Sequence, residues 1–225
     1  MALRPNPAPF LGRLFVVGGQ CRKVGKSSLV ADLIRMLPDG RWTAVKITPY
    51  AESGCPLNGA SCGCAPFEHT FAIREEESRV TRGDTARYLG AGAEKAIWVQ
   101  TKKGRLSEAL AVLALRLAGA ENVIIESDAI VRYWQPDLFL MVLDPRKADF
   151  KSSARHALVF ADAFVFRSPY EGQEEGVARE LTRNGKRKFL QPVGYDLPAS
   201  MQTFVRQRFA LPRHPIAGQA RCIFC

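Results

Sequence analysis

The sequence lacks any apolar run near the roughly 18 residues that a membrane-spanning helix requires, so we expect no membrane partner. Residues 1–13 lack the apolar core of a secretory signal, which predicts a cytoplasmic protein. The three histidines fall in no arrangement typical of Ser/His/Asp or Cys/His catalysis, and no internal repeat is visible. What the chain does carry is positive charge. Its 32 Lys and Arg against 22 Asp and Glu favour anionic partners.

Short apolar segments alternate with helical patterns along the whole chain. The segments expected to form strands are residues 14–17, 43–47, 96–99, 122–125, 138–143, 163–166 and 188–191. Helical periodicity covers residues 27–37, 84–91, 106–117, 172–184 and 199–208. Buried parallel strands are continuous apolar runs, and helices form their crossover connections. The alternation predicts an α/β domain with a doubly wound, mainly parallel sheet of about seven strands and helices on both faces.

Two stretches interrupt this alternation and divide the chain. We expect a Pro-rich lead-in at residues 1–12, a main domain at 13–210 with an insertion at 49–83, and a C-terminal tail at 211–225. Connections as long as the insertion are usually functional or lack fixed structure. The insertion and the tail hold five of the six cysteines, which suggests that the two segments share a role.

Residues 14–29 (LFVVGGQCRKVGKSSL) predict a strand, a Gly-containing loop and a helix that opens at Gly25, Lys26 and Ser27. In such a phosphate-binding loop, or P-loop, backbone N–H groups and the helix dipole face a phosphate, the Lys adds a charge and the Ser holds Mg²⁺. The pattern G-x-x-x-x-G-K-[ST] meets Gln20 at its first glycine, so the loop either is one residue longer, from Gly19, or starts on another residue type. The residues expected to bind nucleotide are Gly19, Gln20, Arg22, Lys23, Val24, Gly25, Lys26, Ser27 and Ser28.

The loop makes ATP or GTP with Mg²⁺ the expected ligand. A solvated basic surface around a nucleotide pocket then accounts for the positive charge. A polynucleotide surface is the alternative, which we do not favour because aromatic residues are not interleaved with the basic ones. Cys21 lies inside the loop. We interpret it as a small filler, with a redox brake on nucleotide binding as the alternative.

Carboxylates near strand ends are the candidates for catalysis. Glu126 follows the apolar run 122–125, and the carboxyl edge of a doubly wound sheet carries the ligands, where an acid orients Mg²⁺ or its water. Asp84 begins a helix after the insertion. The alternative for Asp84, and for Ser127 or Asp128 after the strand, is a helix N-cap. Two further residues, either ligands or ordinary polar strand ends, are Lys46 and Asp144.

The remaining cysteines predict a metal site. Cys222 and Cys225 have the C-x-x-C spacing of half a zinc knuckle, and the Gly-rich segment GCPLNGASCGC holds Cys55, Cys62 and Cys64. Four of these thiolates would bind one Zn²⁺ and tie the tail to the insertion, leaving the fifth or His69 over. The alternatives are an iron–sulfur cluster, reduced thiols without metal, and a redox pair of cysteines in the tail.

A further set of motifs lies between residues 13 and 145. They are Gly25-Lys26-Ser27, Lys46 at a strand end, Gly83-Asp84-Thr85 followed by Ala91-Gly92-Ala93, and Val123-Ile-Ile-Glu126. Together they resemble the P-loop protein B family of molybdopterin-guanine dinucleotide biosynthesis. The resemblance implies the signal-recognition-particle/MinD-like class of P-loop NTPases, which are often dimeric. It also implies that Lys26 and Ser27 contact phosphate and Mg²⁺, with Asp84 and Glu126 near the metal and the attacking water.

The chain departs from that family at several positions. Thr48 stands where the family has His, and Ser127 stands where a Gly follows the strand. Related GTPases carry Asn-Lys-x-Asp after a late strand, whereas this chain has Phe166-Arg-Ser-Pro, so the base preference stays open.

The sequence as a whole predicts an Mg²⁺-dependent nucleoside triphosphate-binding protein, a slow NTPase in a cofactor-biosynthesis or metal-related pathway. Two alternatives remain open: a small-molecule kinase or ligase, and a non-enzymatic metal-delivery or regulatory module switched by nucleotide. Expected partners are the nucleotide, a small-molecule or protein acceptor, and a second copy of the chain in a homodimer.

Overall fold

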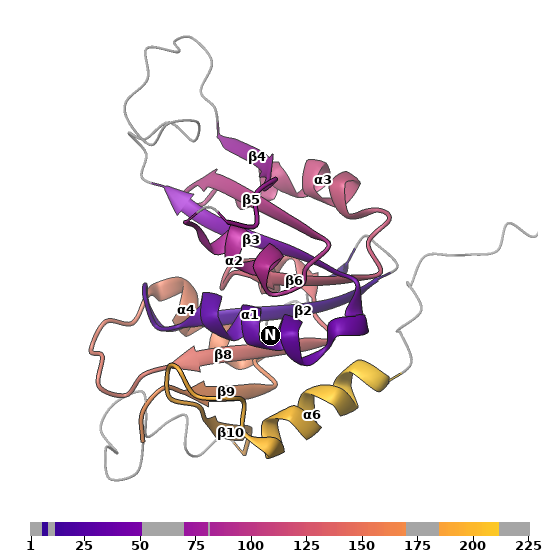
Figure 1. The fold of residues 1–225 in the computed structure, drawn as a ribbon. Helices are drawn as coiled ribbons and strands as arrows, with labels where there is room; N and C mark the ends of the chain where they lie inside the picture. Colours follow the sequence, from indigo (N-terminus) through magenta and orange to yellow (C-terminus); the bar gives the residue numbers. More distant parts are fainter. Residues whose placement is uncertain (1–5, 9–11, 51–69, 81, 170–184, 212–225) are drawn as a thin grey trace, which may run out of the picture.

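A computed structural model describes residues 6–8, 12–50, 70–80, 82–169 and 185–211. Within these residues, eight strands form one sheet in the order β10-β9-β8-β2-β6-β3-β5-β4 (Figure 1). They are β2 (Arg13–Gly19), β3 (Trp42–Tyr50), β4 (Phe71–Glu75), β5 (Lys95–Lys102), β6 (Asn122–Glu126), β8 (Leu138–Leu143), β9 (Ala163–Phe166) and β10 (Arg187–Leu190). All neighbouring pairs are parallel except β4–β5. A separate parallel pair joins β1 (Asn6–Pro7) to β7 (Trp134–Gln135).

The described helices alternate with the strands. They are α1 (Lys26–Met36), α2 (Asp84–Gly90), α3 (Leu106–Leu117), α4 (Ser152–Ala157) and α6 (Ala199–Ala210), with 3₁₀ turns η1 (Pro38–Gly40), η2 (Ile130–Arg132) and η3 (Leu158–Phe160). The predicted doubly wound, mainly parallel α/β sheet is confirmed, since all seven expected strands are present. The helix expected at 172–184 lies outside the described residues. Among those described, no helix is both long and apolar enough to span a bilayer.

The stretch 49–83, expected to be a connection, contains strand residues near both of its ends. β3 continues to Tyr50, and β4 inside this stretch adds an eighth strand, antiparallel to β5. The strand is short, lies at the sheet edge and alternates little in polarity, with Arg74 and Glu75 exposed. Such an edge strand lacks the apolar run that marks the buried parallel strands, and its partner is distant in sequence. The stretch is therefore part strand and not only a connection.

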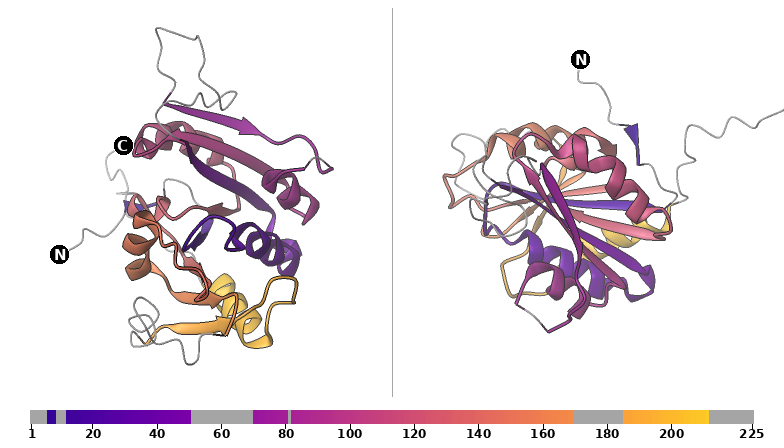
Figure 2. Two further views of the ribbon diagram at one scale, coloured as in Figure 1. Left: turned by 90° about the vertical axis from the view of Figure 1, so that its left-hand side faces the viewer. Right: turned by 90° about the horizontal axis from the view of Figure 1, so that it is seen from above.

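Helices cover both faces of the sheet, as the two views of Figure 2 show. On one face α1, α2 and α6 bury their apolar sides against β2, β3 and the strands beyond. On the other face α3 and α4 do the same. The rings of Phe15, Trp42 and Phe209 pack together, with centroids 5.3 to 6.1 Å apart, which fastens α6 to β2 and β3. Each face thus has its own core, as a doubly wound fold requires.

The strand register brings three side-chain positions level with one another. Val17 in β2 pairs with Glu126 in β6, and Glu126 pairs on its other side with Lys46 in β3. Because paired residues of adjacent strands point to the same face, Lys46 and Glu126 lie side by side. The carboxyl end of β2 leads directly into the loop before α1. The fold therefore places Lys46, Glu126 and the loop before α1 at one edge of the sheet.

The packing of α3 gives a test of the core. Leu113 is fully buried against the sheet, whereas Leu115 on the same helix is 78% exposed. Leu113→Ala should lower the free energy of unfolding by about 2–5 kcal/mol through lost contacts and a residual cavity. Leu115→Ala is the matched control and should change it by less than about 0.5 kcal/mol. Denaturant unfolding measures both, and equal effects would contradict this placement of α3.

Candidate functional site

The loop between β2 and α1 consists of residues 20–25, because the strand ends at Gly19 and the helix begins at Lys26. It therefore starts on Gln20. Lys23 and Gly25 have left-handed backbones, with φ of 57° and 97°. No side chain caps the N-terminus of α1, and its first turn contains no acidic residue. The positive end of the helix dipole is thus left without compensation from its own sequence, which is the electrostatic condition for binding an anion.

Lys26 lies back across the loop. Its Nζ donates a hydrogen bond to the carbonyl oxygen of Cys21 at 2.9 Å. A Cβ atom at Gly19 would lie 2.7 Å from both Lys26 Cγ and Val24 Cγ1, so the glycine makes room for the lysine stem. Burial lowers the pKa of Lys26, while Asp128 and Glu126 act in the opposite direction. Among the described residues, the ammonium is therefore held inside the loop by one neutral acceptor.

Gln20, where the motif has glycine, braces the loop from outside. Its Nε2 donates to the carbonyl oxygen of Lys147 at 2.6 Å, and its Oε1 accepts the backbone N–H of Asp144 at 2.9 Å. Lys147 returns a hydrogen bond from Nζ to the carbonyl oxygen of Lys23 at 3.1 Å. The segment after β8 is thus fastened to the loop, and the departure from the motif has a structural role.

Five charged or hydroxyl side chains meet beside the start of α1. Ser27 Oγ donates to Glu126 Oε2 at 2.7 Å. Lys46 Nζ lies 3.2 Å from both carboxylate oxygens of Glu126 and 3.3 Å from Ser27 Oγ, and it also bonds Asp84. Tyr88 donates its hydroxyl to Glu126 Oε2. Four elements, α1, α2, β3 and β6, therefore contribute to one oxygen-rich cluster around an ammonium group.

Ionisation in the cluster follows from burial and charge. Burial pushes the pKa of Asp84 upward, but the hydrogen bond and charge of Lys46 outweigh it, so the pKa lies below its usual value. Burial, reinforced by Glu126, raises the pKa of Tyr88 well above the ordinary value. Tyr88 therefore stays a neutral donor, while Asp84 stays a carboxylate.

Asp128 has a place that the sequence does not predict. Its Oδ1 accepts the backbone N–H of Gly19 at 2.6 Å, at the end of β2. Burial raises its pKa, and the charge of Lys26 and the Gly19 N–H partly offset this. Its neighbour Ser127 stabilises the turn that precedes η2, since its Oγ accepts the backbone N–H groups of Ala129 and Ile130, but the N-cap position of η2 is Ala129.

Arg167, at the end of β9, supports the loop from behind. The residue is only 4% exposed, and its guanidinium donates to the carbonyl oxygen of Gly25 at 2.6 Å and to Gln191 Oε1 at 2.7 Å. Its Nε has no partner among the described residues. Ser168 donates to Asp144 Oδ1 at 2.8 Å. The late-strand residues are thus engaged in fixing the loop.

The other predicted residues separate by exposure. Arg22 and Lys23 point to solvent, Val24 is buried, and Ser28 is half-buried. Burial also raises the pKa of the Cys21 thiol. The predicted ligands Cys55, Cys62, Cys64, Cys222 and Cys225, with His69, lie outside the described residues. Within the described ranges, no three His, Cys, Asp or Glu side chains form a metal cluster.

Sequence reasoning missed Tyr88 and Arg167. Tyr88 lies four residues after Asp84 in α2, so helical spacing places it on the same face and gives a usable signal. Arg167 gives no such signal, because its partner Gly25 is 142 residues away.

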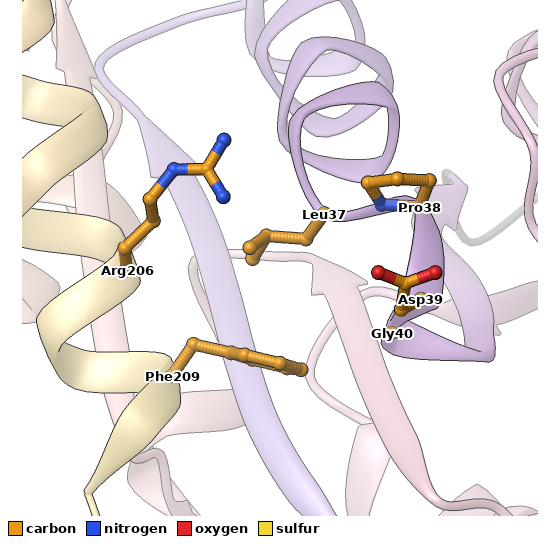
Figure 3. Close-up of a pocket in the computed structure, with 6 residues that line it drawn as sticks. All are labelled: Leu37, Pro38, Asp39, Gly40, Arg206 and Phe209. Atoms are coloured by element: carbon orange, nitrogen blue, oxygen red, sulfur yellow. The ribbon is translucent and has the colours of Figure 1, made fainter.

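A separate cavity of about 240 Å³ lies at the opposite end of α1 (Figure 3). Figure 3 shows Arg206 and Phe209 of α6 facing the turn that follows α1. The turn contributes Leu37, Pro38, Asp39 and Gly40. The cavity is therefore not part of the loop site.

The sequence matches no protein-family model and no curated protein sequence. Its structure is similar to LpxK from Aquifex aeolicus, crystallised in complex with ATP, at 20% identity and a TM-score of 0.47, covering 84% of this chain and 56% of that one. It is also similar to a zinc-bound triple mutant of the YjiA GTPase, at 13% identity and a TM-score of 0.41, covering 93% and 66%. The chain thus spans less than two thirds of either neighbour, and similarity at this level assigns it no function.

Gly25 offers a test of the loop geometry. Alanine there would hold a left-handed φ, and its Cβ would lie 2.8 Å from Arg167 Nε. Gly25→Ala should lower the free energy of unfolding by about 2 kcal/mol. Gly119→Ala is the control, since a Cβ there meets nothing within 4 Å, and it should change stability by less than about 0.5 kcal/mol. Matching denaturation midpoints for the two variants would show that Gly25 is not constrained.

Proposed function

We propose that this protein binds a nucleoside triphosphate with Mg²⁺ at loop 20–25 and slowly hydrolyses its terminal phosphate. One observation carries the proposal. Lys26 and Ser27 open α1 directly beside a cluster of two carboxylates that come from other elements of the fold. A phosphate chain and a hard cation need these two kinds of group next to each other.

The loop supplies the phosphate contacts. The N-terminal N–H groups of α1, whose own first turn carries no acidic residue, favour a multiply charged anion. Lys26 gives up one hydrogen bond to a carbonyl when it turns to a phosphate, and it gains a charge-assisted one. Burial lowers the pKa of Lys26. The negative charge of a bound phosphate would raise it again and so favour the charged ammonium. Two basic residues of the loop itself, Arg22 and Lys23, are exposed to solvent.

The oxygen donors suit a magnesium ion. Ser27 Oγ and the carboxylates of Asp84 and Glu126 are hard ligands, the type that Mg²⁺ prefers. They already surround a cation, the ammonium of Lys46, which indicates that the cluster accommodates positive charge. When bound, Mg²⁺ would neutralise charge that develops on the phosphate oxygens. Asp84 is well suited to ligation because its lowered pKa keeps it ionised.

The hydrogen bonds to Glu126 are the reason that we propose slow turnover. Ser27, Lys46 and Tyr88 all donate to this carboxylate, so it has little freedom to take a proton from water. Its role is to orient the attacking water and the side chains around it. Arg167 and Ser168 do not select the nucleobase in this proposal, because they are engaged with the loop and with Asp144. We therefore propose either ATP or GTP as the nucleotide.

Transfer to an acceptor other than water remains the second candidate. The engaged Glu126 favours it, because an enzyme of this kind stays nearly idle until its acceptor arrives. The cofactor-biosynthesis or metal-related pathway and the homodimer rest on the sequence resemblance. A nucleotide-switched metal-delivery or regulatory module stays an alternative. The zinc or iron–sulfur site rests on cysteines outside the described residues and stays a prediction.

Removing the loop lysine tests the proposal. Lys26→Ala should weaken Mg²⁺–nucleotide binding about a hundredfold, because a charge-assisted contact to a phosphate is worth a few kcal/mol. Lys95→Ala is the control, since Lys95 pairs with Glu75 at the opposite end of the sheet. Calorimetry with ATP and with GTP measures both variants. Equal affinity of the wild type and Lys26→Ala would refute the site.

The role of Glu126 has its own test. Glu126→Gln keeps the shape but removes the charge, so turnover should fall about tenfold or more while nucleotide affinity changes little. Glu94→Gln is the matched control, because Glu94 pairs with Arg41 on the exposed surface before β5. Phosphate release, measured with saturating nucleotide, distinguishes them. Unchanged hydrolysis in Glu126→Gln would move the assignment to Asp84 or Asp144.

A further inference from the structure

The ammonium group of Lys46 lies in a cage of oxygen atoms. Both oxygens of Glu126 are 3.2 Å from Nζ, Ser27 Oγ is 3.3 Å away, and Asp84 is in direct contact. The cage is sheltered, since the side chains of Lys46 and Glu126 are 20% and 6% exposed. These oxygens are the ones that the proposed function assigns to a magnesium ion. An ammonium and a divalent cation cannot share them, because like charges at such distances repel strongly.

The ammonium has a reason to stay while no other cation is present. Without it, Glu126 and Asp84 would be two neighbouring negative charges, one of them almost fully buried, and an unpaired buried charge is costly. A metal ion that arrives alone must displace Lys46 and shed its own water. A metal ion that arrives with a nucleotide brings phosphate oxygens, which also accept the released ammonium.

Tyr88 and Ser27 keep the cage in shape when the ammonium leaves. Both donate to Oε2 of Glu126. Among the described residues, the donor to Oε1 is Lys46. Release of Lys46 therefore opens Oε1 and Asp84, while Glu126 stays oriented.

We propose that Lys46 is a place-holding cation. It keeps free divalent metal out of the site and leaves the carboxylates only when the metal enters together with a nucleotide. The inference rests on the proposed function for the entry of nucleotide, but its metal half needs no nucleotide. Lys46 therefore controls when the metal can enter. After it leaves the carboxylates, its ammonium lies beside the phosphates.

Manganese binding without nucleotide is the direct test. Free Mn²⁺, measured by electron paramagnetic resonance, should bind Lys46→Met about tenfold more tightly than wild type, because the competing charge is gone. Lys95→Met is the control. It removes the lysine that pairs with Glu75 of the neighbouring strand, and this variant should bind Mn²⁺ as the wild type does. The double variant Lys46→Met with Asp84→Asn should lose the gain. Thermal unfolding first establishes that each variant is folded.

A wild-type measurement covers the case in which Lys46→Met does not fold. With ¹⁵N-labelled lysine, an ammonium held by carboxylates gives its own NMR signal, and Lys46→Arg identifies it. Mg²⁺ alone should leave this signal unchanged, and Mg²⁺ with nucleotide should shift it. Equal Mn²⁺ affinity of folded Lys46→Met and wild type, or a shift with Mg²⁺ alone, overturns the inference. Absent nucleotide binding in calorimetry would instead refute the proposed function and leave the Mn²⁺ comparison intact.

Discussion

The ion pair between Lys46 and Glu126 is the interaction on which the site depends. The two residues lie level on neighbouring strands, so the sheet register itself sets their separation. Ser27 brings the start of α1 to this pair, and Asp84 and Tyr88 bring α2. Two helices and two strands are thereby held around charges that are largely withdrawn from water. Loss of the Lys46 charge would leave the buried carboxylate of Glu126 without its counter-ion, so the pair is a fixed reference for this edge of the sheet.

The loop is also held by hydrogen bonds to segments outside it. Gln20 fastens the loop to the segment after β8, and Arg167 fastens Gly25 to β9 and β10. Lys26 crosses the inside of the loop over Gly19. These contacts fix the loop backbone from several sides, which would reduce the ordering cost of binding the proposed nucleotide. Gln20, which departs from the glycine of the sequence motif, is itself one of the residues that hold the loop.

Most of the sheet follows from the sequence, because its central strands are continuous apolar runs between helical patterns. β4 does not, since its five residues mix polar and apolar side chains and pair only at the edge. The meeting of Lys46 and Glu126 is predictable because strand ends share one edge, whereas the contact of Asp84, which begins α2, does not follow from that argument. Arg167 is out of reach of sequence reasoning because no local pattern marks a contact across 142 residues. The cysteines of the insertion and the tail lie outside the described residues, and their role rests on spacing alone.

The central claim is that phosphates bind at the start of α1 while Lys46 leaves its carboxylates. A crystal structure with Mg²⁺ and a non-hydrolysable nucleoside triphosphate tests it most directly. The account predicts phosphate density against the backbone N–H groups of Gly25, Lys26 and Ser27, a metal ion on Ser27, and Lys46 Nζ turned from Glu126 to a phosphate oxygen. Nucleotide bound elsewhere on the molecule, with Lys26 still on the Cys21 carbonyl and Lys46 still between Asp84 and Glu126, would contradict it.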